Sequence, residues 1–166
     1  YGIYSVLFIS IFLVGLSVGS FINVLVDRLP VKGDVLKDRS KCNHCKKKLG
    51  FFELIPLLSY FALKGKCKTC KKPISEVYPF TELAAGVLFV LSLLRFVHIL
   101  DPYSLTSIFS VLGLSALVGL FLSIFLFFAV YDVLYMEVSD RYAIPISISM
   151  VIINIGLLAY SLILKE

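Results

Sequence analysis

Residues 106–132 read "TSIFSVLGLSALVGLFLSIFLFFAVYD", and this stretch decides the class of fold. It contains no charged residue before Asp132. A helix of roughly 20 such residues, rising about 1.5 Å per residue, is long enough to cross the hydrocarbon core of a bilayer. Three other largely apolar runs, residues 3–26, 80–100 and 142–164, have similar lengths. We therefore predict an all-α membrane protein with four transmembrane helices.

The composition agrees with this class. Hydrophobic residues make up 59% of the chain, charged residues only 16%, and the mean hydropathy is +0.95. A soluble helix confines its apolar residues to one stripe, whereas these runs are apolar on every face. The first run has no basic start and exceeds the apolar part of a signal peptide, so we expect a permanent span.

The positive charge is concentrated in one loop. Between Asp27 and Tyr78 lie 13 of the 16 lysines and arginines, against five acidic residues. In a soluble protein such a patch would indicate nucleic-acid binding. In a membrane chain the positive-inside rule accounts for it, and predicts a cytoplasmic loop near anionic lipid headgroups, with no nucleic-acid partner. The predicted organisation is therefore a first helix at 1–26, a cytoplasmic loop at 27–79, and three further helices at 80–166, with Asp132 on the cytoplasmic side.

The basic loop contains all four cysteines of the chain. Cys42 and Cys45 form "CNHC", and after 21 residues Cys67 and Cys70 form "CKTC". Two C-x-x-C pairs at this separation predict a four-thiolate structural zinc site between the first two helices. Another soft metal or an iron–sulfur centre is an alternative, as are two disulfides, which reducing conditions in the cytoplasm disfavour. His44 lies inside the first pair, and we interpret it as an exposed neighbour.

The stretch between the two cysteine pairs, residues 51–66, reads "FFELIPLLSYFALKGK". It is apolar enough to lie on the membrane face or to pack against the spans. The simpler interpretation, which we favour, is a short amphipathic helix that covers the metal-binding lobe.

Three segments form a combined pattern: "GLSVGSFINVLVDRLP" at 15–30, "ELIPLLSYFALKGKCKTCKKPISEVYPFTEL" at 53–83 and "YDVLYMEVSDRYAIP" at 131–145. Together, in this order, they resemble the bacterial type IV prepilin peptidases. The resemblance implies an aspartyl protease of the bacterial cytoplasmic membrane, which cuts the basic leader of pilin-like precursors after a glycine on the cytoplasmic side. It also implies methylation of the new amino terminus with S-adenosylmethionine, an activity that many members have.

The family uses two catalytic aspartates, and Asp132 matches the first by position. Two carboxylates that share a site separate their pKa values, so that one activates water while the other donates a proton. The second aspartate of the family lies in a Gly-x-Gly-Asp motif, and this sequence contains no such motif. Glu137 and Asp140 follow Asp132, but we interpret them as solvated loop charges and not as its partner.

This departure leads to two hypotheses. We expect the chain to be the amino-terminal portion of a longer enzyme, inactive alone because it lacks the second aspartate. The alternative is a non-enzymatic membrane module that binds a partner of a pilus or secretion assembly.

Polar and small residues within the spans have simpler explanations. Gly15 and Gly19 form a small-xxx-small pair suited to close helix packing, and Ser20, Asn23 and Glu82 are expected to form hydrogen bonds between helices. A role for Asn23 or Glu82 in holding substrate or methyl donor is the alternative.

Overall fold

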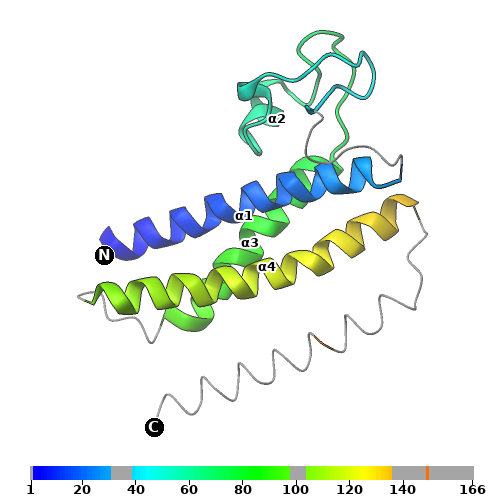
Figure 1. The fold of residues 1–166 in the computed structure, drawn as a ribbon. Helices are drawn as coiled ribbons and strands as arrows, with labels where there is room; N and C mark the ends of the chain where they lie inside the picture. Colours follow the sequence, from blue (N-terminus) through cyan, green and yellow to red (C-terminus); the bar gives the residue numbers. More distant parts are fainter. Residues whose placement is uncertain (1, 31–38, 98–103, 136–148, 150–166) are drawn as a thin grey trace.

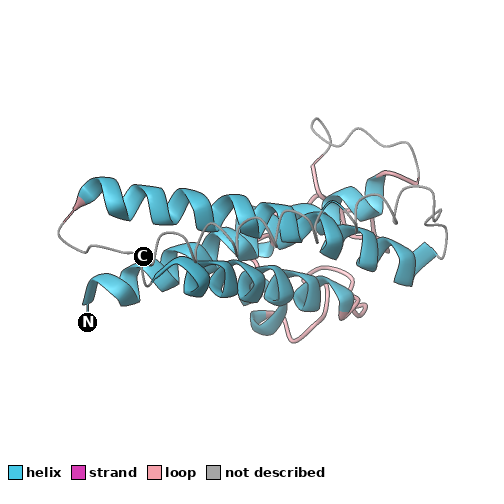
Figure 2. Ribbon diagram, turned by 90° about the horizontal axis from the view of Figure 1, so that it is seen from below, coloured by secondary structure: helices cyan, strands magenta, loops and turns pink. Residues whose placement is uncertain are grey.

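The computed structural model describes residues 2–30, 39–97, 104–135 and 149. Three long helices run side by side, and a small lobe lies against one end of the first (Figures 1 and 2). The elements in chain order are α1 (Gly2–Arg28), η1 (Phe51–Glu53), α2 (Leu58–Ala62), α3 (Val77–Phe96) and α4 (Leu105–Tyr135). Helices α1 and α4 run in the same direction and α3 runs against them, as successive crossings of a bilayer require (Figure 1).

Three of the four predicted spans are confirmed as helices. Among the described residues, α1, α3 and α4 are long and apolar enough to cross a membrane. The fourth predicted span, residues 142–164, lies outside the described residues apart from Ser149. Helix α4 continues through Tyr135, beyond the predicted end at residue 131, because residues 133–135 contain neither glycine nor proline to end it. Asp132 therefore lies within the last turn of the helix.

The contact between α1 and α3 depends on two glycines. A Cβ atom placed on Gly15 would lie 2.7 Å from the Cα atom of Gly86, and one on Gly19 would lie 2.6 Å from the Cα atom of Glu82. Since such distances are far shorter than a carbon–carbon contact, only hydrogen fits at either position. The predicted small-xxx-small packing is confirmed.

Two apolar clusters hold the bundle together. The larger one lies around the fully buried ring of Phe89, which packs against the bare backbone of Gly119 on α4. Beside it the hydroxyl of Ser92 donates to the carbonyl of Ser115, a buried hydrogen bond of 2.7 Å between α3 and α4. The smaller cluster consists of Ile22, Val26 and Val130 and joins the ends of α1 and α4.

The outer surface of the bundle is apolar as well. Large hydrophobic side chains on each long helix are more than two-fifths exposed, among them Leu13, Leu91 and Leu117. In water such a surface would be unfavourable, whereas lipid chains solvate it without cost.

Candidate functional site

The four cysteines converge on one point of the lobe. All four Sγ atoms lie within 4.8 Å of one another, and those of Cys42 and Cys70 are 3.9 Å apart. A tetrahedral zinc ion with bonds of about 2.3 Å holds its sulfur ligands roughly 3.8 Å apart. No disulfide joins these cysteines. The residues thus fit a four-thiolate metal site, and His44, exposed at the surface, is not among the clustered side chains.

The two cysteine pairs have the same backbone geometry. The carbonyl of Cys42 accepts a hydrogen bond from the N–H of Lys46, and that of Cys67 accepts one from Lys71, at 2.9 and 3.0 Å. Lys46 and Lys71 both adopt positive φ angles, 57° and 58°. Each pair therefore forms a tight knuckle, and in the second one the backbone N–H groups of Thr69 and Cys70 turn toward the sulfur of Cys67.

These amides shape the acidity of the thiols. The backbone N–H groups of Cys70 and Thr69 lower the pKa of Cys67 to about 6. The backbone of Lys72 acts in the same direction on Cys70, but burial and the neighbouring cysteines outweigh it and raise the pKa of Cys70 to about 11. At neutral pH the metal-free cluster therefore favours a thiolate at Cys67. A cationic metal requires such negatively charged sulfur ligands.

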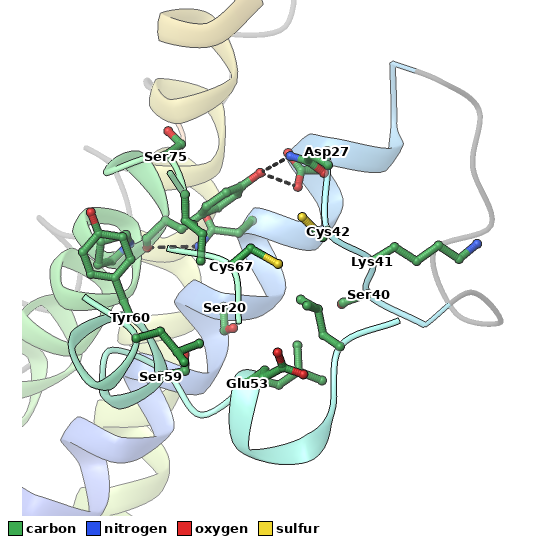
Figure 3. Close-up of a pocket in the computed structure, with 18 of the residues that line it drawn as sticks. Ser20, Asp27, Ser40, Lys41, Cys42, Glu53, Ser59, Tyr60, Cys67 and Ser75 are labelled. Atoms are coloured by element: carbon green, nitrogen blue, oxygen red, sulfur yellow. Dashed lines mark hydrogen bonds between the residues drawn. The ribbon is translucent and has the colours of Figure 1, made fainter. Parts of the chain in front are cut away.

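A chain of hydrogen bonds fixes the lobe to the helices. The side-chain amide of Asn43 donates to the hydroxyl of Tyr78, which in turn donates to the carboxylate of Asp27, each at 2.9 Å. Asn23 donates to the backbone carbonyl of Tyr78 at 3.1 Å. The end of α1, the start of α3 and the first knuckle thus meet at one tyrosine (Figure 3).

Between the lobe and the helices lies a pocket of about 360 Å³ (Figure 3). Three carboxylates line it, Asp27, Glu53 and Glu82, together with the side chains of Tyr60 and Tyr78. Lys41, His44 and Lys68 line it as well. The pocket therefore offers charged groups of both signs to a small ligand.

Sequence reasoning missed the roles of Asp27, Asn43 and Tyr78. Asp27 was visible only as the first charge after an apolar run, and its hydrogen bond to Tyr78 spans 51 residues of chain. No periodicity or spacing within either segment encodes that contact. Glu82 and Asn23, which the sequence did single out, both form hydrogen bonds that join separate segments.

Asp132 lies on α4 at the same end of the bundle as the lobe. Its side chain is exposed. Two residues earlier, Val130 is buried against Ile22 and Val26 of α1, close to where α1 leads into the lobe. Glu137 and Asp140 lie outside the described residues. The carboxylate of Asp132, exposed near the end of α4, is therefore accessible from outside the bundle.

The comparisons with known proteins agree with this arrangement. Residues 13–96, from the middle of α1 through α3, match the bacterial peptidase A24 N-terminal domain. A prepilin leader peptidase/N-methyltransferase of Myxococcus xanthus is 45% identical over 86 residues, which cover 52% of this chain and 26% of the relative. One of Bacillus subtilis is 33% identical over 131 residues, covering 79% of this chain and 48% of the relative. No solved structure matches.

The chain thus spans about a quarter to a half of the length of these curated relatives. The matched region contains both knuckles, the residues that join them to the helices, and the small-residue packing of α1 on α3. By these features the chain belongs to the bacterial type IV prepilin peptidases, of which it carries the amino-terminal region.

Proposed function

We propose that this chain forms the amino-terminal part of a prepilin leader peptidase that also methylates the amino terminus it exposes. The observation that carries the proposal is the position of Asp132 at the end of the bundle where α1 leads into the cysteine lobe, in a chain of this family. The substrates are pilin-like precursors, whose basic leaders are cut after a glycine. The working site is the cytoplasmic side of the bacterial inner membrane, since basic loops remain in the cytoplasm.

The peptidase chemistry requires Asp132 to act with a second carboxylate. One of the two groups, ionised, takes a proton from water, and the resulting oxygen attacks the carbonyl carbon of the glycine. The other group, protonated, donates its proton to the leaving amine as the peptide bond breaks. The exposed position of Asp132 at a helix end supports this role, because both water and the peptide must reach it.

The four cysteines would hold a structural zinc ion. Since all four ligands come from the protein, no coordination position remains open for substrate. The ion would fix the two knuckles against each other, and with them the wall of the pocket to which Cys42 and Cys67 contribute.

The methyltransferase part would use the pocket between the lobe and the helices. S-Adenosylmethionine would supply an electrophilic methyl group for the new amino terminus. The pocket volume is within the usual range of roughly 300–1,000 Å³ for small-molecule sites. Asp27 and Glu82 would complement the positive charge of a sulfonium, and Tyr60 would offer an aromatic surface.

The pocket assignment can be tested by titrating S-adenosylmethionine into the purified full chain by calorimetry. We expect binding, and a loss of several-fold in affinity for Asp27→Asn. Asp132→Asn is the control and should bind as the unsubstituted chain does. Absence of binding in the unsubstituted chain would remove the pocket assignment and leave the peptidase proposal intact.

The peptidase proposal is tested by Asp132→Asn in the complete protein, with cleavage of a prepilin in membranes as the readout. Loss of one carboxylate of a catalytic pair should abolish detectable cleavage. Glu76→Gln, an exposed acidic residue just before α3, is the matched control and should cleave normally. If Asp132→Asn cleaved at the normal rate while a Cys42→Ser variant lost function, the non-enzymatic module would be the better description.

A further inference from the structure

The segment between the two knuckles presents an apolar surface that neither the metal site nor the pocket uses. Residues 51–63 contain one charged residue, Glu53. Four large side chains of the segment are well exposed: Phe51 by 78%, Phe52 by 81%, Leu58 by 67% and Phe61 by 69%. This much exposed aromatic and aliphatic surface indicates a contact with a partner or a membrane.

The position of the segment along the bundle identifies the contact. The backbone N–H of Leu57 donates to the carboxylate of Glu82 at 2.8 Å. Glu82 packs against Gly19 of α1, seven residues before Val26, where the first apolar run ends. At 1.5 Å per residue, Gly19 lies about 10 Å along the helix axis from Val26, inside the apolar run. The segment therefore lies beside the membrane-spanning part of α1, and Figure 1 shows α2 alongside the second half of that helix.

The anchoring contact has a defined geometry. Leu57 adopts φ 58° and ψ −51°, and the N–H of Leu58 donates to the carbonyl of Pro56 at 2.6 Å. This is a γ-turn with positive φ, a strained conformation for leucine that the surrounding contacts must maintain. Glu82 also accepts a hydrogen bond from Ser20 of α1. A buried carboxylate at this depth needs such partners, and here they fix the turn to both α1 and α3.

The charges at the two ends of the segment match a lipid surface. Two lysines shortly before it and three shortly after it flank the segment, namely Lys46, Lys48, Lys64, Lys66 and Lys68, whereas the ammonium group of Lys47 donates to Thr69 within the lobe. Lysine side chains beside an apolar surface extend their ammonium groups toward headgroups, and anionic phospholipids attract them.

We propose that residues 51–63 form a re-entrant segment, which inserts Phe51, Phe52, Leu58 and Phe61 among the acyl chains of the leaflet on the side of the cysteine lobe. The occupant of this surface is an anionic phospholipid bilayer. The inference requires only that α1 and α3 span the membrane and is independent of the catalytic roles proposed above.

The chain contains no tryptophan, so a single introduced tryptophan reports on its own surroundings. The variants are Phe52→Trp and Phe61→Trp, with Thr69→Trp in the second knuckle as the control. Each full chain is placed in nanodiscs of phosphatidylglycerol and phosphatidylcholine, with or without bromine on the acyl chains. We expect blue-shifted emission at both test positions and quenching by bromine several-fold greater than for the control.

Either of two different results would overturn the proposal. Emission as in water, with no quenching by brominated lipid, would mean that the segment is solvated. Blue-shifted emission without quenching would mean that protein covers the surface, either a second copy or another part of the complete enzyme. A metal measurement on each variant verifies that the lobe has folded.

The anchoring role of Glu82 is tested in the Phe52→Trp background. Glu82→Gln retains an oxygen that accepts the hydrogen bond of Leu57, whereas Glu82→Leu removes it. We expect the bromine quenching of the tryptophan to persist with glutamine and to fall toward the control value with leucine. Equal quenching in both variants would show that Glu82 does not hold the segment in the membrane.

Discussion

At the scale of single residues, the fold depends on positions where a side chain is absent or where one hydroxyl joins three segments. Gly15 and Gly19 let the backbones of α1 and α3 touch, which brings Glu82 beside Ser20. Tyr78 connects Asp27 with Asn43. The first two positions were predictable from their spacing, because small residues four apart share one helix face.

Gly19→Leu should destabilise the protein, by about 1–3 kcal/mol or more, since the added side chain must displace the backbone of α3. The measurement is thermal unfolding in detergent, followed by circular dichroism. Gly113→Leu on α4 is the matched control, because a Cβ atom there meets nothing within 4 Å. Equal Tm values for the two variants would contradict the close α1–α3 contact.

Tyr78→Phe should loosen the first knuckle from the helices. It removes the hydroxyl that links Asn43 to Asp27, a loss of about 1–2 kcal/mol for a part-buried hydrogen-bonded group. We expect faster amide hydrogen exchange in residues 39–50, measured by mass spectrometry, while the metal content stays unchanged. Tyr60→Phe, in the same lobe but outside this chain of hydrogen bonds, should exchange as the unsubstituted protein does.

At the scale of elements, the two knuckles are copies of one small unit, each with two cysteines and one lysine of positive φ in equivalent positions. Such a lobe has little apolar core of its own. We therefore expect its order to depend on a metal ion bound by the four cysteines and on the contacts with α1 and α3. The cysteine spacing predicted the ligand set, but the attachment of the lobe to the helices involves residues that no motif marks.

Zinc should leave the lobe only at low pH. The folded protein lowers the pKa of Cys67 from 9.0 to about 6, so the thiolate is favoured above pH 6 and is lost as the pH falls through that value. Bound metal lowers the pKa further, so half-release is expected at or below about pH 6. A colorimetric zinc assay across a pH titration measures this, with His44→Ala as the control that should release zinc at the same pH. Release above pH 7 would exclude a thiolate site of this kind.

At the scale of the whole molecule, charge and hydropathy divide the protein into two parts. The bundle is apolar outside as well as inside, whereas residues 27–78 contain 13 basic and five acidic residues, an excess of positive charge larger than the net charge of +5 of the whole chain. The remaining residues are therefore net negative.

The lobe should lie in the cytoplasm, because moving 13 basic residues across the membrane is disfavoured during insertion. A membrane-impermeant amine reagent should label its lysines in inverted vesicles and leave them unlabelled in intact spheroplasts. Labelled peptides are identified by mass spectrometry after digestion. Labelling in intact spheroplasts would reverse the orientation, and with it the side on which Asp132 acts.

The sequence by itself determined the class of fold, three described spans, the grouping of the four cysteines and the family, because each depends on local properties: length, hydropathy and spacing. Only the tertiary structure decided how the lobe sits on the bundle. The hydrogen bonds of Tyr78 to Asp27 and of Leu57 to Glu82 cross 51 and 25 residues of chain. These partners come from separate segments that only the packing of the lobe and helices brings together, and no local pattern records which residues will meet.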